Sequence, residues 1–134
     1  MPEAEGAVEI VRRYADAWAR GDAATVIGLY ADDIVLHYFG DNPIAGEHRG
    51  KPAALAVLGR LTQAVKRGAP EIHDVLGGEH HAAVMAKERW GEGADAIELN
   101  RVLLYHVRDG KLAECWIYDQ DQRLVDSILA ERLG

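Results

Sequence analysis

The chain of 134 residues has the length of one globular domain, and its content of 49% hydrophobic and 28% charged residues argues against disorder. A formal net charge of −7, with scattered basic residues, argues against a nucleic-acid partner, because such binding depends on Lys and Arg that neutralise phosphates. One cysteine, an acidic N-terminal segment unlike a secretory signal, and no apolar stretch near the roughly 18 residues of a membrane span lead us to expect a cytoplasmic protein.

Two helices are predicted at the start of the chain. The first covers about residues 5–20, where apolar residues recur three or four positions apart. This apolar stripe consists of Val8, Val11, Ala15 and Trp18. Gly21 is a natural end for the helix, and Asp22 predicts the N-cap of a short second helix over about residues 23–30.

A strand, a turn and a third helix are predicted next. Residues 34–39 are rich in β-branched and aromatic side chains, which favour a strand, and residues 40–43 have the composition of a turn. A short extended segment covers residues 44–49. Gly50 and Pro52 then open a helix that ends near Gly68 and Pro70.

Four more strands and a last helix complete the predicted order. The strands cover residues 71–76, 82–90, 96–107 and 112–118, with turns between them. Asp109 and Gly110 form the most characteristic of these turns, a tight hairpin. Asp121 predicts the N-cap of a short C-terminal helix.

This order of elements predicts an α+β fold over a single domain, residues 1–134. Strands joined by hairpins form an antiparallel sheet, and the N-terminal helices are expected to pack on one side of it. Long strands twist and curl, so the sheet is expected to form a cone that encloses an apolar pocket for a small molecule.

Several short motifs point to a family. They are Arg13-Tyr14, residues 19–22, residues 29–33, residues 43–46, Arg49-Gly50, and residues 108–114 followed by Trp116. Their order resembles the nuclear transport factor 2-like superfamily, in its SnoaL-like and ketosteroid isomerase-like branch. The resemblance covers nearly the whole chain and implies a cone-shaped, cystatin-like fold, a homodimer and an enclosed pocket. The branch includes isomerases, polyketide cyclases, epoxide hydrolases and proteins without known catalysis, so the fold does not select an activity.

Tyr14 matches the position where ketosteroid isomerases place a tyrosine that donates a hydrogen bond to the developing enolate. The alternative is an aromatic core residue of an amphipathic helix. In the same comparison the catalytic aspartate of the first strand corresponds to Tyr38, and a second acidic residue corresponds to Leu103. A neutral tyrosine accepts protons poorly, so the usual isomerase mechanism is not expected.

His37 is a second candidate base, because its ordinary pKa suits proton transfer at neutral pH. Neighbouring strand residues point to opposite faces, so only one of His37 and Tyr38 can face the pocket. The alignment favours Tyr38. His37 then makes a structural hydrogen bond on the far face or at a dimer contact.

Cyclases and epoxide hydrolases of the branch place an aspartate after the Trp of the last strand, where this chain has Ile117. Asp119 shares a face with Cys115 and Ile117, so it is a candidate base at the pocket mouth. The alternative is a capping role at the final helix, together with Asp121.

Alternation along residues 82–90 places Glu88 and Trp90 on the inward face, and Arg101 on the next strand shares that face with Leu103. We therefore expect an ion pair between Glu88 and Arg101, which either orients a substrate or is structural. Trp18 and Trp90 are candidate pocket walls, or simply core residues.

Three hypotheses follow from these residues. The first is an enzyme without cofactor or metal that transfers a proton at a carbonyl or epoxide of a small apolar substrate, using Tyr14, Tyr38, His37 and Asp119. The second is a small-ligand-binding homodimer without catalysis, and the third a structural dimerisation domain. The expected dimer contact is the outer face of the sheet, formed by Val102, Leu104, Trp116 and Tyr118.

Overall fold

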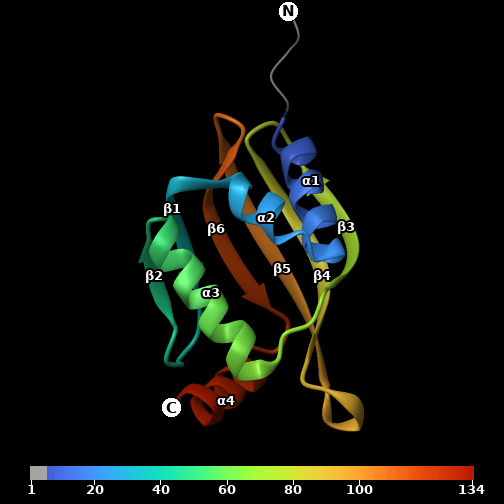
Figure 1. Ribbon diagram of the computed structural model, residues 1–134, viewed down its shortest axis with the longest axis vertical. Helices are drawn as coiled ribbons and strands as arrows, with labels where there is room; N and C mark the ends of the chain where they lie inside the picture. The colour runs from blue at the N-terminus through green and yellow to red at the C-terminus, as the bar shows by residue number, and fades with distance from the viewer. Residues whose placement is uncertain (1–5) are drawn as a thin grey trace, which may run out of the picture.

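The computed structural model describes residues 6–134 and shows the helices and strands in the predicted order (Figure 1). The helices are α1 (Ala7–Arg20), α2 (Ala23–Leu29), α3 (Lys51–Val65) and α4 (Gln122–Leu133), with a short 3₁₀ turn, η1 (Gly93–Asp95). The strands are β1 (Tyr30–Tyr38), β2 (Gly46–Arg49), β3 (Glu71–Gly77), β4 (His81–Trp90), β5 (Ile97–Arg108) and β6 (Lys111–Asp119). The α+β class is confirmed.

The six strands form one curved sheet in the order β2-β1-β6-β5-β4-β3. The strand pairs adjacent in sequence are antiparallel, as expected for hairpins, but β1 runs parallel to β6. The sheet is therefore mixed rather than purely antiparallel. The difference arises because β1 and β6 are far apart in sequence and are not joined by a hairpin turn, so they need not be antiparallel.

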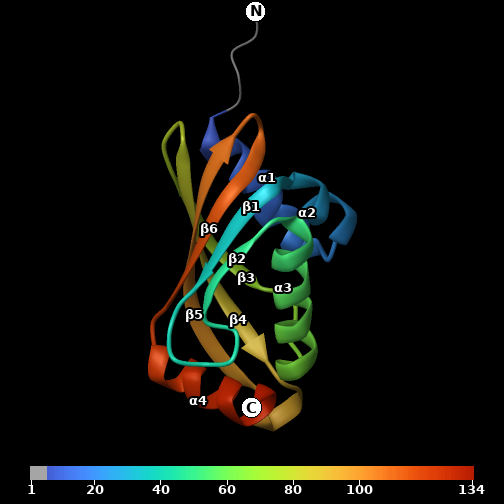
Figure 2. The same cartoon turned by 90° about the vertical axis from the view of Figure 1, so that its left-hand side faces the viewer.

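Helices α1, α2 and α3 cover one face of the sheet, and α4 lies across one end of it (Figure 2). The strand ends at Tyr38, Trp90 and Asp119 lie toward this α4 end. Among the described residues, no helix is long and apolar enough to cross a membrane.

Local chemistry explains most element ends. Gly21 ends α1 in the left-handed conformation at φ 74°, and the Asp22 carboxylate caps α2 by accepting a hydrogen bond from the Thr25 backbone N–H at 3.2 Å. Asp109 and Gly110 both have positive φ, as the predicted two-residue hairpin requires. Asp121 caps α4 in the same way as Asp22 caps α2.

The largest difference from the predicted element lengths is at β1, which begins at Tyr30, directly after α2, rather than at Ile34. The short 3₁₀ turn η1 lies in the segment between the predicted strands 82–90 and 96–107. The predicted start of the first helix at Glu5 lies outside the described residues. Alternating burial along β4 and β5 confirms their predicted inward faces, and these side chains join those of α1 and α3 in one core.

Candidate functional site in the interior of the sheet

Strand register arranges the inward side chains in layers that begin at the α4 end. Arg101 of β5 lies opposite Asp119 of β6 and Ala86 of β4. On β4, Ala86 is one inward-facing position farther from the α4 end than Glu88. Further in, Leu103 lies opposite Ile117. We call Tyr38, Arg67, Glu88, Arg101 and Asp119 the charged layer.

The deeper layer consists of phenols. Tyr105 of β5 lies opposite Cys115 of β6, and its ring meets the edge of Tyr14 at a centroid distance of 5.0 Å. Tyr14 also packs against Tyr30. We call Tyr14, Tyr30 and Tyr105 the tyrosine layer.

Glu88 is fully buried and is held mainly by Arg67, which follows α3. Arg67 donates from Nε and Nη2 to the two carboxylate oxygens of Glu88 at 2.5 and 2.7 Å. The indole Nε1–H of Trp90 donates to Oε1 of the same carboxylate at 3.0 Å. This bidentate geometry is the strong form of a charge-assisted hydrogen bond.

Arg101 is the centre of the charged layer. Its Nε and Nη2 donate to Asp119 at 2.6 and 3.0 Å, and Nη2 also donates to the Tyr38 hydroxyl at 2.6 Å. A longer contact of 3.4 Å joins Nη1 to Glu88 Oε1, which confirms the predicted pair. Arg101 therefore lies between two carboxylates and also donates a hydrogen bond to the Tyr38 hydroxyl.

Two tryptophans cover the guanidinium groups. Arg67 lies over the ring of Trp18 at 4.9 Å, and Arg101 lies over Trp90 at 5.2 Å. Cation–π contacts of this kind gain strength when the cation is removed from water. The expected pocket walls Trp18 and Trp90 thus contact charged side chains.

Mutual pairing keeps these groups ionised. Burial alone would raise the pKa of Glu88, but the charges of Arg67 and Arg101 outweigh it and lower the pKa to about 2. Burial likewise acts to lower the pKa of the two arginines, and Glu88 reverses that direction. Two cations and two anions make the layer formally neutral.

Tyr38 is the member of the layer suited to donate a proton. Burial raises its pKa, although Arg101 acts in the opposite direction, so the phenol is neutral at physiological pH. Its oxygen accepts a hydrogen bond from Arg101, which leaves its own proton for another acceptor.

The tyrosine layer is neutral. The hydroxyls of Tyr14 and Tyr30 are 3.0 Å apart and share one hydrogen bond. Burial raises the pKa of all three phenols, and it raises the pKa of the neighbouring Cys115 thiol to about 12. Cys115 is therefore a protonated thiol, without the thiolate character that a nucleophile requires.

The large side chains of both layers nearly fill the interior. A cavity of about 20 Å³ remains between them, lined by the tyrosine layer, by Arg67 and by apolar residues that include Leu103 and Ile117. This volume suits about one water molecule. The interior is thus nearly filled, whereas the sequence predicted a ligand-sized apolar pocket there.

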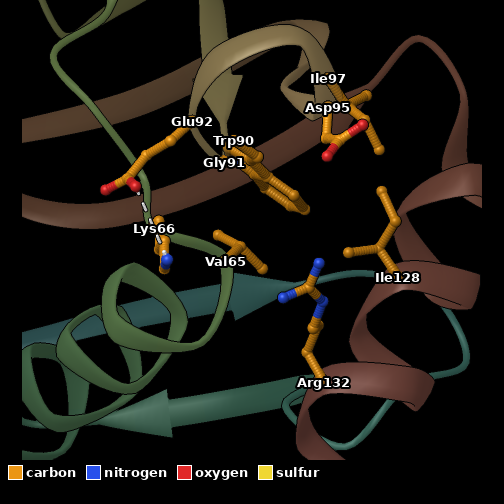
Figure 3. A pocket seen from close by; sticks show the side chains of 9 residues that line it. All are labelled: Val65, Lys66, Trp90, Gly91, Glu92, Asp95, Ile97, Ile128 and Arg132. Atoms are coloured by element: carbon orange, nitrogen blue, oxygen red, sulfur yellow. Dashed lines mark ion pairs between the residues drawn. The ribbon is translucent and has the colours of Figure 1, made fainter.

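A larger crevice of about 250 Å³ opens at the α4 end (Figure 3). Trp90 forms part of its wall, and the same indole bonds Glu88 on the interior side. Trp90 therefore separates the crevice from the charged layer.

His37 lies on the outer face of the sheet, away from Tyr38. Its ring stacks on Trp116 at 5.2 Å, and its Nε2 is 2.5 Å from Glu114. Strand alternation explains the placement, as the alignment with Tyr38 had indicated. His37 is therefore outside the interior site.

The structure brings together Tyr38, Glu88, Arg101 and Asp119 as the inward faces predicted, and it keeps Tyr14 in the other layer. Arg67 was missed. It follows a helix at a position without strand or helix periodicity, and its only sequence signal is that a buried carboxylate needs a cation. Within residues 6–134 no three His, Cys, Asp or Glu side chains are grouped as a metal site.

Comparison with known families identifies the domain to which most of the chain corresponds. A family model described as a SnoaL-like domain matches residues 11–115. Among curated proteins, none matches the chain.

Solved structures share the fold. A protein with a cystatin-like fold from Xanthomonas campestris has a TM-score of 0.81 at 22% identity, over 91% of this chain and 96% of that chain. An NTF2-like protein from Burkholderia xenovorans has a TM-score of 0.68 at 26% identity, over 95% of each chain. A putative polyketide cyclase from Sinorhizobium meliloti has a TM-score of 0.63 at 23% identity, over 81% of this chain and 93% of that chain.

Proposed function

Because the chain belongs to the SnoaL-like family, we propose that it is a cofactor-free enzyme that transfers a proton at a carbonyl or epoxide oxygen of a small, largely apolar molecule. The observation that carries the proposal is Arg101 held between Glu88 and Asp119, with the Tyr38 hydroxyl bound to the same guanidinium. The likeness to a putative polyketide cyclase supports the reaction class.

In this proposal Tyr38 is the acid and Asp119 the base. Tyr38 donates its proton to the substrate oxygen, and Arg101 stabilises the charge that develops on the phenol. Asp119 gives up one of its two bonds to Arg101 and takes a proton, from a water molecule in hydration or from carbon in isomerisation or cyclisation. Glu88 and Arg67 hold Arg101 in place.

In the hydration of an epoxide, each bond that breaks is matched by a bond that forms. Water attacks one ring carbon, the C–O bond to that carbon breaks, and the ring oxygen takes the Tyr38 proton. Asp119 takes the proton that the water loses, and its transfer back through solvent restores the phenol. The product is a vicinal diol, with no change in oxidation level.

Substrate must reach an interior that side chains nearly fill. Trp90 is the side chain between the 250 Å³ crevice and the charged layer, so a change of its rotamer is the proposed entry step. The crevice then becomes the mouth of the site.

The test is turnover of a panel of cyclic and aryl epoxides and 1,3-dicarbonyl compounds, followed by mass spectrometry in H₂¹⁸O. We expect Asp119→Asn and Tyr38→Phe each to lower the rate about 100-fold or more, the usual effect of removing an acid or base. Asp109→Asn and Tyr118→Phe are matched controls, because Asp109 lies in a hairpin turn and Tyr118 lies outside the charged layer, with its ring stacked on Phe39. Wild-type rates in both site variants would refute the assigned roles.

A second candidate is a ligand-binding protein without catalysis. It is favoured by one observation: Glu88 and Asp119 are both engaged by arginines, so neither carboxylate is free to accept a proton as the structure stands. A small apolar molecule that copurifies in native mass spectrometry and is recovered unchanged after incubation supports this candidate. A product would exclude it.

We also propose that the outer face of the sheet binds a second copy of the chain. Met85, Val102 and Tyr118 are 42%, 37% and 46% exposed there and line one shallow hollow, so they offer a shared apolar surface for a second copy. Light scattering at micromolar concentration is expected to give a dimer mass, and Val102→Asp a monomer mass. A monomer in the wild-type protein would refute this contact.

A further inference from the structure

The crevice at the α4 end is built from four segments of the chain (Figure 3). The end of α3, the end of β4 with the turn after it, the start of β5 and α4 each contribute side chains. Its lining residues are Val65, Lys66, Trp90, Gly91, Glu92, Asp95, Ile97, Ile128 and Arg132. Its volume of about 250 Å³ is below that of drug-sized pockets, so it suits a smaller molecule.

One part of the crevice is apolar. Trp90 and Val65 face Ile97 and Ile128 across it (Figure 3). Helix α4 is a firm wall, because Val125 and Leu129 on its other side are fully buried in the core. A flat apolar or aromatic body is the chemistry that such a surface takes up.

The four charged side chains of the crevice differ in whether they have a partner. Lys66 and Glu92 pair with each other at 3.7 Å near the rim. Arg132 and Asp95 reach into the crevice from opposite sides, and neither makes an ion pair within residues 6–134 (Figure 3). A guanidinium and a carboxylate are thus left to meet a ligand.

We propose that this crevice binds a small amphipathic acid. Its carboxylate pairs with Arg132, because a guanidinium binds a carboxylate through two parallel hydrogen bonds. Its apolar body lies against Trp90, and its other end carries a hydrogen-bond donor for Asp95. A second carboxylate at that end is repelled by Asp95.

The position of Trp90 connects this site to the interior. The indole that lines the crevice donates to Glu88 and lies over Arg101 at 5.2 Å. A bound acid therefore touches the side chain that closes the charged layer. The inference names a substrate class for the proposed function, and it rests on that function only for the route of entry.

The test is calorimetry with 3-(4-hydroxyphenyl)propanoate on the full chain. We expect the acid to bind at least tenfold more tightly than its neutral amide and than the dianion 3-(4-carboxyphenyl)propanoate. Arg132→Gln is expected to weaken acid binding about tenfold, as loss of a charged pair does, and to leave the amide unchanged. Arg123→Gln, on the same helix but outside the crevice lining, is the matched control.

The indole N–H resonance of Trp90 supplies a second readout, with Trp116 on the outer face as reference. Saturable shifts of Trp90 alone support the site. Equal binding of acid and amide, equal loss in the Arg123 and Arg132 variants, or no heat at millimolar acid would overturn it. Asp119→Asn separates the two proposals: acid binding that persists in this variant without turnover leaves this site standing. Turnover by the wild type without acid binding leaves only the proposed function.

Discussion

The charged layer and the tyrosine layer bury polar side chains in opposite ways. In the charged layer every ionised group is held by a partner of opposite charge, and Glu88 stays ionised down to a pKa of about 2. In the tyrosine layer burial keeps the phenols neutral, and one hydroxyl pair joins Tyr14 to Tyr30. Removing one partner of a buried charge pair costs about 3–5 kcal/mol, against about 0.5–1.5 kcal/mol for a neutral hydrogen bond.

The two layers are therefore expected to differ in their sensitivity to substitution and to pH. The charged layer is the part whose loss is expected to unfold the protein and whose protonation couples stability to pH. The tyrosine layer is expected to tolerate single changes. The experiments that follow compare the two.

The largest effect is expected from Glu88→Gln. It leaves the Arg67 charge buried with a neutral partner and leaves Arg101 paired with Asp119 alone, so the free energy of unfolding should fall by about 3–5 kcal/mol in urea titrations at pH 7. Glu98→Gln, at an exposed carboxylate near Lys87, is the control and should change it by less than about 1 kcal/mol. Similar losses in the two variants would contradict a special role for the buried charge.

The next largest effect is expected in the pH dependence of stability, to which the charged layer should contribute and the tyrosine layer should not. The pKa of Glu88 is lowered in the folded chain from 4.5 to about 2, so its stabilising effect is complete above about pH 4.5 and is lost as the pH falls toward 2. The difference corresponds to roughly 3 kcal/mol. The gap in unfolding free energy between wild type and Glu88→Gln should therefore narrow over this range. Parallel curves would show that Glu88 is not the titrating group.

Tyr14→Phe tests the other layer. It removes the hydroxyl bonded to Tyr30 and should lower the free energy of unfolding by about 1 kcal/mol, because the remaining phenol is neutral. The loss should be the same at pH 5 and pH 8, since burial raises the pKa of both phenols. Tyr118→Phe, at a phenol outside both layers, is the control. A loss in Tyr14→Phe as large as that in Glu88→Gln would contradict the distinction between the layers.

The smallest effect is expected from His37→Gln. The side chain lies on the outer face beside Glu114 and Glu47, where partly exposed pairs contribute below about 1 kcal/mol. Glutamine can still donate to Glu114. Any turnover found for the wild type should persist, in contrast to Tyr38→Phe one residue away, and a loss of turnover would return His37 to the list of catalytic residues.

Alternation along strands was enough to predict much of this arrangement. It placed Glu88, Arg101 and Asp119 on inward faces, and it predicted that Tyr38 and His37 point to opposite sides. Spacing along α1 likewise put Tyr14 toward the core.

The remaining features depend on information that periodicity does not carry. Arg67 is at the end of a helix, and only the three-dimensional path brings it to Glu88. The small size of the interior cavity depends on the volumes and rotamers of many side chains together, which a sequence pattern does not give. To predict that Asp119 pairs with Arg101, and does not cap a helix, one also needs the register of β5 on β6.

The parallel pairing of β1 with β6 has a consequence for how the chain folds. His37 and Glu114 touch across 77 residues of sequence, so closing this contact costs more chain entropy than closing any of the hairpins. During synthesis the apolar residues of β1, such as Ile34 and Leu36, have only β2 beside them until β6 has been made. We expect the β3–β6 meander to assemble first and β1 to dock late, which makes this strand edge the place where an unfinished chain is most open to aggregation.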